Sequence, residues 1–322
     1  MLKILFFPVL ALLSVLTQAQ VLEPGKGKFE FVDQNLKQKT DVYYYAPKQL
    51  TAETPLIIML HGLKRNADEY RDKWIKLAIE NGYMVLAPKI SANTYPGMNG
   101  YNLGNVMEAK DLFIPKDKKF WSFALIDQLI VHYRKNIIKA DTQKVFVLGH
   151  SAGCQFVHRF MMFQPTQKAD LVVCSAAGWY TFADRDIQWP YGLKGTQDLV
   201  SDDLLKSGHS APFILMVGEK DNKMTARTLR RTPEAMAQGR QRVTRAKSYF
   251  DHRQKLAADM GHDFKWSFRE VAQAGHGYGK VAKFASTIIN QFLEDGTIPL
   301  QPEISKVPQY KLPQRGNDED GF

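Results

Sequence analysis

The chain has 322 residues, of which 44% are apolar and 24% are charged, and both values are ordinary for a globular protein. This length is sufficient for one large α/β domain with a substantial core. The formal net charge of +10 comes with no recognised nucleic-acid-binding motif, so the sequence argues against a nucleic-acid partner.

The first nineteen residues have the three parts of a secretory signal peptide. Met1-Leu2-Lys3 is a short positive start, Ile4 to Leu16 is almost wholly apolar, and Thr17 and Ala19 are small residues at the cleavage positions. An uncleaved membrane anchor is less favoured because the apolar run is short for a transmembrane span. We therefore expect cleavage after Ala19, no stable membrane insertion, and a secreted or periplasmic location.

Two segments rich in β-forming residues follow, at 28–32 and 41–45, and predict an antiparallel pair. Continuous apolar runs then predict buried strands, and helical spacing of apolar residues predicts the helices between them. The strands are expected at 55–60, 83–87, 144–148, 171–174, 212–217 and 267–272, and the helices at 67–80, 123–133, 152–163 and 281–293. This alternation favours a mostly parallel sheet with helices on both faces.

Two long excursions interrupt the predicted domain, which spans residues 20–294. Residues 91–116 are rich in Gly, Asn and Pro and predict a long loop at the functional edge. Residues 178–208 form a candidate cap or substrate-binding insertion. Residues 295–322, rich in Pro, Gln and charged side chains, predict a poorly ordered tail.

Five aromatic residues gather in the second excursion: Trp179, Tyr180, Phe182, Trp189 and Tyr191. Two interpretations are open. The side chains line an acyl or aryl pocket, or they form a small satellite core that holds the insertion in place.

Much of the positive charge lies between Lys223 and Lys255, where ten basic residues accompany two acidic ones. Such a segment can attract an anionic polymer or surface, but we expect a well-solvated helical face.

The only cysteines are Cys154 and Cys174. The first lies on the helix predicted at 152–163 and the second on the next predicted strand, so we expect the two side chains to be in contact. Whether they form a disulfide or are two small buried apolar residues is left open.

Gly149-His150-Ser151-Ala152-Gly153 matches the pattern G-x-S-x-G, between a predicted buried strand and a predicted helix. A sharp strand-to-helix turn needs small flanking residues, and it lifts the serine hydroxyl above the sheet at a helix N-terminus. We therefore predict that Ser151 is a catalytic nucleophile.

A serine nucleophile needs a base, and the base needs an acid to orient it. Asp221 follows the strand predicted at 212–217, and His276 follows the last predicted strand within Ala274-Gly275-His276-Gly277. We predict Asp221 as the acid and His276 as the base, with Glu219 in the same loop as Asp221 as the alternative acid. The other histidines considered lack this setting; they are His150, His158, His209, His252 and His262.

The segment Leu60-His61-Gly62-Leu63 ends an earlier buried strand. In this architecture that loop supplies one backbone N–H to an oxyanion hole, and the residue after the nucleophile supplies another. We predict the backbones of Leu63 and Ala152 as the donors, and His61 as a structural residue.

Together, Leu60-His61-Gly62, Gly149-His150-Ser151-Ala152-Gly153, Gly218-Glu219-Lys220-Asp221 and Gly275-His276-Gly277 resemble the motifs of α/β-hydrolases, over residues 37–293. Within that superfamily the chain is similar to exported esterases related to polyhydroxybutyrate depolymerases and feruloyl esterases. The resemblance implies the α/β-hydrolase fold and a serine esterase.

The expected function is hydrolysis of a small or polymeric carboxylic ester through an acyl-enzyme, with no cofactor and no metal implied. The alternatives are a peptidase or other acyl-transfer enzyme using the same three residues, or a catalytically silent relative that binds ligands in the same pocket. The oligomeric state is not predicted.

Overall fold

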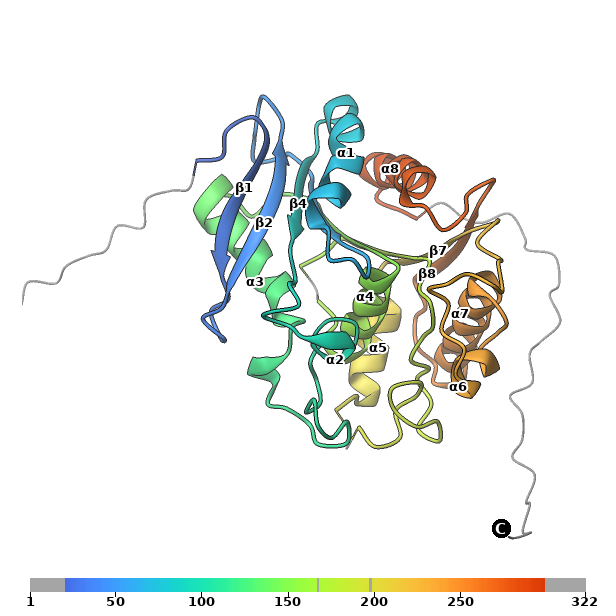
Figure 1. Ribbon diagram of the computed structural model, residues 1–322. Helices are drawn as coiled ribbons and strands as arrows, with labels where there is room; N and C mark the ends of the chain where they lie inside the picture. Colours follow the sequence, from blue (N-terminus) through green and yellow to red (C-terminus); the bar gives the residue numbers. More distant parts are fainter. Residues whose placement is uncertain (1–20, 167, 197–198, 299–322) are drawn as a thin grey trace, which may run out of the picture.

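The computed structural model describes residues 21–166, 168–196 and 199–298 (Figure 1). The predicted signal peptide over residues 1–19, and residues 299–322 of the tail predicted at 295–322, lie outside the described residues. The strands are β1 (Gly25–Val32), β2 (Lys39–Ala46), β3 (Leu56–Leu60), β4 (Met84–Pro88), β5 (Val145–His150), β6 (Leu171–Ser175), β7 (Phe213–Gly218) and β8 (Trp266–Val271).

These strands form one sheet in the order β1-β2-β4-β3-β5-β6-β7-β8. Strand β2 is antiparallel to both of its neighbours, β1 and β4, and every pair from β4 to β8 is parallel. The loops that follow the parallel strands therefore gather at one edge of the sheet. This is the α/β-hydrolase fold, as predicted: the strands follow its order, β2 runs antiparallel to its neighbours, and helices connect the parallel strands.

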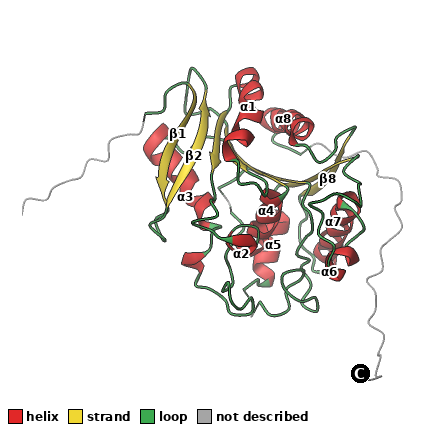
Figure 2. Cartoon of the chain, viewed as in Figure 1, coloured by secondary structure: helices red, strands yellow, loops and turns green. Residues whose placement is uncertain are grey.

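Helices cover both faces of the sheet (Figure 2). They are α1 (Ala67–Asn81), α2 (Gly97–Gly100), α3 (Ala124–His132), α4 (Ala152–Phe163), α5 (Asp202–Ser210), α6 (Pro233–Ala237), α7 (Arg242–Asp259) and α8 (Tyr278–Asp295), with a 3₁₀ turn η1 (Lys118–Phe120) and a π-helical turn η2 (Tyr133–Ile138). No helix within the described ranges combines the length and apolar character that a membrane crossing requires.

The core divides into two layers because successive side chains of a strand point to opposite faces. In β3, Ile57 and Met59 pack with α1 and α8, whereas Leu56, Ile58 and Leu60 pack with α3, α4 and α7. Figure 1 shows α1 and α8 together on one side of the sheet and the other large helices on the opposite side. The central strands are buried on both faces, which explains their continuous apolar sequences.

The aromatic residues of the second excursion belong to the main core. Trp179, Tyr180, Phe182, Trp189 and Tyr191 are all buried, and they join the same cluster as α4 and α7. None of them lines the pocket beside Ser151 that is described below. The pocket-lining interpretation is therefore wrong for these side chains, and they stabilise the domain by packing.

Candidate active site

Ser151 lies at the turn between β5 and α4 with φ 54° and ψ −111°, a backbone conformation that residues other than glycine rarely adopt. The flanking glycines are needed for close approach of the backbone. A Cβ atom at Gly149 would collide with the carbonyl of Gly153, and one at Gly153 would collide with the carbonyl of Leu60. The strand, turn and helix predicted around Ser151 are thus present, with the serine facing a pocket.

A disulfide joins Cys154 on α4 to Cys174 on β6, with 4.5 Å between their Cα atoms. The predicted contact is confirmed, and of the two open interpretations the structure has the disulfide. It ties α4, which begins directly after Ser151, to β6, the strand beside β5.

His276 and Asp221 come from neighbouring loops at the same edge of the sheet. Asp221 follows β7 and His276 follows β8, and the imidazole Nδ1 lies 2.7 Å from Asp221 Oδ2. The carboxylate is almost fully buried, with a side-chain exposure of 3%, whereas the imidazole is 34% exposed and faces the pocket. Because Nδ1 is occupied by Asp221, Nε2 is the nitrogen left to exchange a proton with a group in the pocket.

Backbone contacts between the two loops set this geometry. The N–H of Lys220 donates to the carbonyl of Ala274 at 2.8 Å, and the N–H of Glu219 donates to that of Val271 at 3.1 Å. The side chain of Glu219, the alternative acid, instead accepts the N–H of Gln273 at 2.8 Å. The structure therefore brings Asp221, and not Glu219, to the imidazole.

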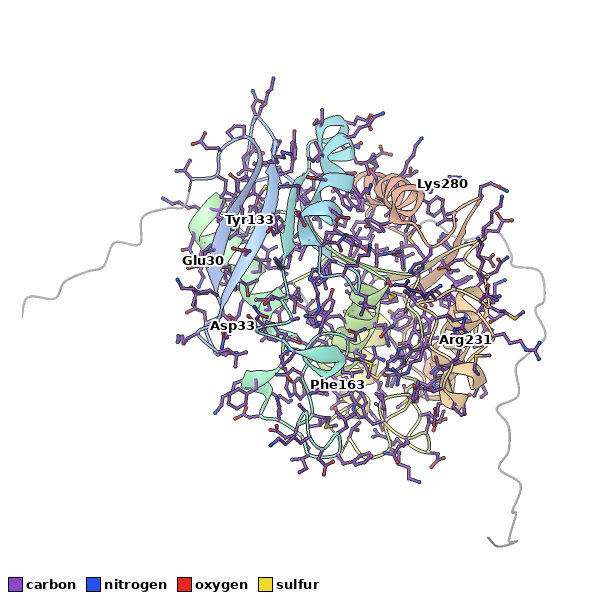
Figure 3. The ribbon with its side chains drawn as sticks, in the orientation of Figure 1. Glu30, Asp33, Tyr133, Phe163, Arg231 and Lys280 are labelled. Carbon is purple, nitrogen blue, oxygen red and sulfur yellow. A yellow bond between two sulfur atoms is a disulfide. The ribbon has the colours of Figure 1, made fainter. Side chains whose placement is uncertain are left out.

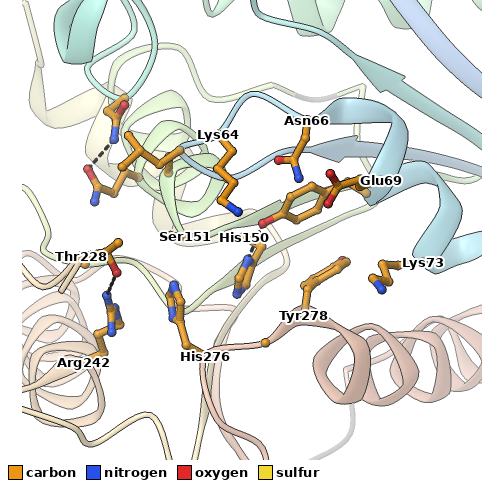
Figure 4. Close-up of a pocket in the computed structure, with 18 residues that line it drawn as sticks. Lys64, Asn66, Glu69, Lys73, His150, Ser151, Thr228, Arg242, His276 and Tyr278 are labelled. Atoms are coloured by element: carbon orange, nitrogen blue, oxygen red, sulfur yellow. Dashed lines mark hydrogen bonds between the residues drawn. The ribbon is translucent and has the colours of Figure 1, made fainter. Parts of the chain in front are cut away.

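A pocket of about 370 Å³ opens over these residues (Figure 4). Ser151 and His276 both line it, as do the two residues predicted to supply oxyanion donors, Leu63 and Ala152. The first excursion also reaches it, through Asn102, whose amide donates to Gln155 Oε1 at 2.9 Å. All the predicted site residues are thus gathered around this pocket, Asp221 from behind His276.

Two further histidines flank the site and are buried. His61 bonds the backbone at Gly62 and Ile90, and burial lowers its pKa to about 4. His150 is held by the Tyr70 hydroxyl, and burial, aided by the nearby charge of His276, lowers its pKa to about 3. Both rings are therefore neutral at ordinary pH, and His61 has the structural contacts that were expected of it.

In the described part of the chain, no group of three or more His, Cys, Asp or Glu side chains is arranged to hold a metal ion. At the pocket, Ser151, His276 and Asp221 supply a hydroxyl, an imidazole and a carboxylate, and the loops around them supply backbone N–H groups.

The sequence matches the model of the dienelactone hydrolase family over residues 40–265, which is most of the described domain. The chain belongs to the dienelactone hydrolase family.

Two solved structures are similar to this member of the family over nearly their whole length. Poly(aspartic acid) hydrolase-1 from Sphingomonas sp. KT-1 is 33% identical with a TM-score of 0.75, over 83% of this chain and 99% of the other. The poly(3-hydroxybutyrate) depolymerase LpqC from Bordetella parapertussis is 30% identical with a TM-score of 0.75, over 86% of this chain and 92% of the other. The similarity to polyhydroxybutyrate depolymerases that the motifs indicated is confirmed.

The bifunctional acetylxylan esterase/xylanase XynS20E of Neocallimastix patriciarum is 28% identical over 163 residues, which are 49% of this chain. The match spans only 21% of that longer protein. The dienelactone hydrolase family, the depolymerase and the acetylxylan esterase together assign the described domain to the carboxylic ester hydrolases.

A buried arginine, which the sequence did not single out, supports the carboxylate in this dienelactone hydrolase family member. Arg242, the first residue of α7, donates from Nη1 to Asp221 Oδ1 at 3.0 Å and from Nη2 to Thr228 Oγ1 at 2.9 Å. Burial alone would raise the pKa of Asp221, but the hydrogen bond from His276 and the charges of His276 and Arg242 outweigh it and lower the pKa. Asp221 therefore stays ionised and has one oxygen on each partner.

Replacing Arg242 with methionine should lower the free energy of unfolding near neutral pH by about 3–5 kcal/mol, because it leaves a buried carboxylate without its cation. Asp221 has a lowered pKa in the folded state, so its contribution is full above the ordinary aspartate pKa of about 3.9 and is lost as the pH falls through the lower, folded value. The difference in the free energy of unfolding between Arg242→Met and the wild type should therefore become smaller below about pH 4.

Denaturant unfolding at several pH values measures this difference. Arg240→Met is the matched control, since Arg240 is an exposed arginine just before α7, and it should change stability by at most about 0.5 kcal/mol. A deficit for Arg242→Met that is the same at pH 7 and at pH 3.5 would contradict the role of the ionised pair.

The expectation of a solvated helical face between Lys223 and Lys255 is wrong for three of its ten basic residues. Arg242, Arg245 and Arg253 are at most 2% exposed, whereas Arg231, labelled in Figure 3, is exposed. The charge count alone gave no sign of this burial, because three of these arginines are on the inner side of α7 and satisfy partners far away in the sequence.

Arg245 illustrates how a buried guanidinium is satisfied without a carboxylate. It donates to three backbone carbonyls, those of Gly178, Gly239 and Arg230. Gly178 lines the pocket, so this side chain ties the pocket wall to α7.

Proposed function

We propose that this protein hydrolyses carboxylic esters through an acyl-enzyme intermediate formed on Ser151, with His276 as general base and Asp221 as its orienting acid. The observation that carries the proposal is the 2.7 Å contact between His276 Nδ1 and Asp221 Oδ2, made beside a serine on a strained strand-to-helix turn that lines the same pocket. Acyl transfer requires this combination of a nucleophile, a base and a group that orients the base.

In the first half-reaction, Ser151 Oγ attacks the carbonyl carbon of the ester while His276 Nε2 accepts the hydroxyl proton. The carbonyl oxygen becomes an oxyanion, which the backbone N–H groups of Leu63 and Ala152 stabilise. The tetrahedral intermediate then collapses, the bond to the alcohol oxygen breaks, and His276 returns the proton to the departing alcohol.

In the second half-reaction, water replaces the alcohol. His276 accepts a proton from a water molecule while the water oxygen attacks the acyl carbon. It then gives that proton to Ser151 Oγ as the carboxylic acid product is released. Asp221 stays ionised throughout. It keeps the imidazole proton on Nδ1 and stabilises the imidazolium that forms twice in each cycle.

The proposed substrates are small or polymeric carboxylic esters, since the relatives include proteins named for poly(3-hydroxybutyrate) and for acetylxylan. A second candidate is amide hydrolysis, because the relative named for poly(aspartic acid), which is a polyamide, is 33% identical. Both reactions use the same nucleophile and base.

A fluorophosphonate probe and a panel of chromogenic esters, each paired with the amide of the same acyl group, test the proposal on the purified protein. We expect labelling and turnover of esters that vary in chain length and aryl character. Faster turnover of the amides would favour the second candidate. The absence of both labelling and turnover would indicate a silent ligand-binding relative and overturn the proposal.

We further propose that the enzyme is exported and cleaved after Ala19, on the basis of the signal-peptide pattern in residues 1–19. The intact mass of the enzyme recovered outside the cytoplasm should correspond to a chain that begins at Gln20. Recovery of the uncleaved chain in the membrane fraction would support the membrane-anchor alternative instead.

A further inference from the structure

Tyr70 is a pocket residue that the proposed mechanism does not use. It lies in the first turn of α1, close after the Gly62–Leu63 loop, and its side chain lines the pocket with Ser151. Its ring packs against His150 at 5.8 Å and Tyr278 at 5.3 Å between ring centroids. The hydroxyl group is therefore held in one place.

The space around Gly62 shows where that hydroxyl lies. A Cβ atom built on Gly62 would be 2.6 Å from Tyr70 Oη and 3.8 Å from Ser151 Cβ. Oη and the nucleophile therefore lie on the same side of Gly62, the residue before the expected oxyanion donor Leu63. A larger residue than glycine at position 62 would displace the hydroxyl.

The Tyr70 hydroxyl is hydrogen-bonded to His150, with 2.8 Å between Tyr70 Oη and His150 Nδ1 (dashed in Figure 4). His150 is neutral, with its pKa lowered to about 3 by burial, so its ring carries one proton. Its Nε2 is buried beside the backbone of His276, which acts as a hydrogen-bond acceptor for the ring and partly offsets the effect of burial on the pKa. The ring proton therefore belongs on Nε2, and the lone pair of Nδ1 accepts the hydrogen bond of the Tyr70 hydroxyl.

In the resting enzyme Tyr70 thus donates to His150 Nδ1. Its proton can turn toward Ser151, because the lone pair left on Nδ1 is less unfavourable than a buried N–H without an acceptor. Burial raises the pKa of Tyr70 to about 12, so the group keeps its proton at ordinary pH. The other tyrosine of the pocket cannot act in the same way. The Tyr278 hydroxyl donates to Met59 Sδ and accepts the indole N–H of Trp74, which directs it into the core.

We infer that the Tyr70 hydroxyl is a third hydrogen-bond donor to the oxyanion formed at Ser151, beside the backbone N–H groups of Leu63 and Ala152. The inference rests on the proposed hydrolysis through Ser151. The charge on the carbonyl oxygen develops only as the carbon becomes tetrahedral, so this hydrogen bond strengthens in the transition state and raises kcat more than it lowers KM. His150, the variable residue of the G-x-S-x-G pattern, then has the role of holding the donor in place.

The test is Tyr70→Phe, which removes one oxygen and keeps the ring packing. Losing one oxyanion donor typically lowers kcat by about 10²–10³-fold, so we expect a loss of roughly 100-fold with KM changed by less than about threefold. Tyr95→Phe is the control. It removes another buried tyrosine hydroxyl, which donates to Asp33 away from the pocket, and should keep wild-type kcat.

A trifluoromethyl ketone inhibitor separates direct contact from positioning, because its adduct with serine carries an oxyanion. If Tyr70 contacts that oxygen, the inhibition constant for Tyr70→Phe should rise by the same factor as kcat/KM falls. A kcat within threefold of the wild type, or a fall in kcat with an unchanged inhibition constant, would overturn the inference.

The wild-type enzyme keeps this failure distinct from failure of the proposed function. If the wild type is labelled by the fluorophosphonate and hydrolyses esters while Tyr70→Phe does so equally well, only the inference about Tyr70 is lost. If the wild type does neither, the hydrolysis itself is refuted before the variants are compared.

Discussion

Replacing Ser151 with alanine is expected to lower ester turnover by about 10⁴-fold or more and to abolish fluorophosphonate labelling, while the protein stays folded. The change removes only the attacking oxygen. It removes no contact that holds the turn, because the turn is fixed by the close approach of Gly149 and Gly153 to neighbouring backbone. Turnover, labelling and the thermal midpoint, measured on the same preparation, check the three parts of this expectation.

Ser175→Ala is the control for Ser151→Ala. Ser175 lies on β6 beside the turn, and its hydroxyl donates to the carbonyl of Gly149 at 3.2 Å. Its loss should reduce stability by about 1 kcal/mol and leave labelling intact. If Ser151→Ala retained most of the wild-type turnover, the assignment of the nucleophile would be wrong.

Asp221→Asn is expected to lower kcat by about 10⁴-fold, because an amide does not favour the imidazole tautomer with its proton on Nδ1. The variant also loses the ion pair with Arg242, so stability must be measured alongside activity. Glu219→Gln is the matched control. Its side chain accepts a backbone N–H from Gln273, which an amide oxygen can also do, and we expect activity close to that of the wild type. If Glu219→Gln lost activity while Asp221→Asn kept it, Glu219 would be the acid instead of Asp221.

The fold was predictable because its strands are buried on both faces and therefore appear in the sequence as apolar runs. The runs at 55–60, 144–148 and 212–217 correspond to β3, β5 and β7 with shifts of one or two residues. The serine turn was equally visible, since the geometry around Ser151 requires two glycines at fixed positions. These features are local, and local sequence is enough to specify them.

What sequence patterns did not reveal depends on contacts between distant segments. Arg242 reaches Asp221 from the start of α7, and Tyr70 reaches Gly62 and His150 from α1, and no spacing rule connects these positions. The aromatic residues of the second excursion were ambiguous for the same reason, because composition does not distinguish a core side chain from a pocket side chain. The disulfide depended on β5 and β6 being neighbours, which only the sheet order establishes.

The three carbonyl bonds of Arg245 have a consequence for motion. One guanidinium on α7 joins the backbone carbonyls of Gly178, Gly239 and Arg230. An opening of the pocket wall at Gly178 that breaks its bond to Arg245 also leaves a buried cation incompletely satisfied, which is costly. Amide hydrogens around Gly178 and in the first turns of α7 should therefore exchange with solvent in one cooperative event, and the pocket wall at Gly178 should behave as a rigid surface against which substrates are held.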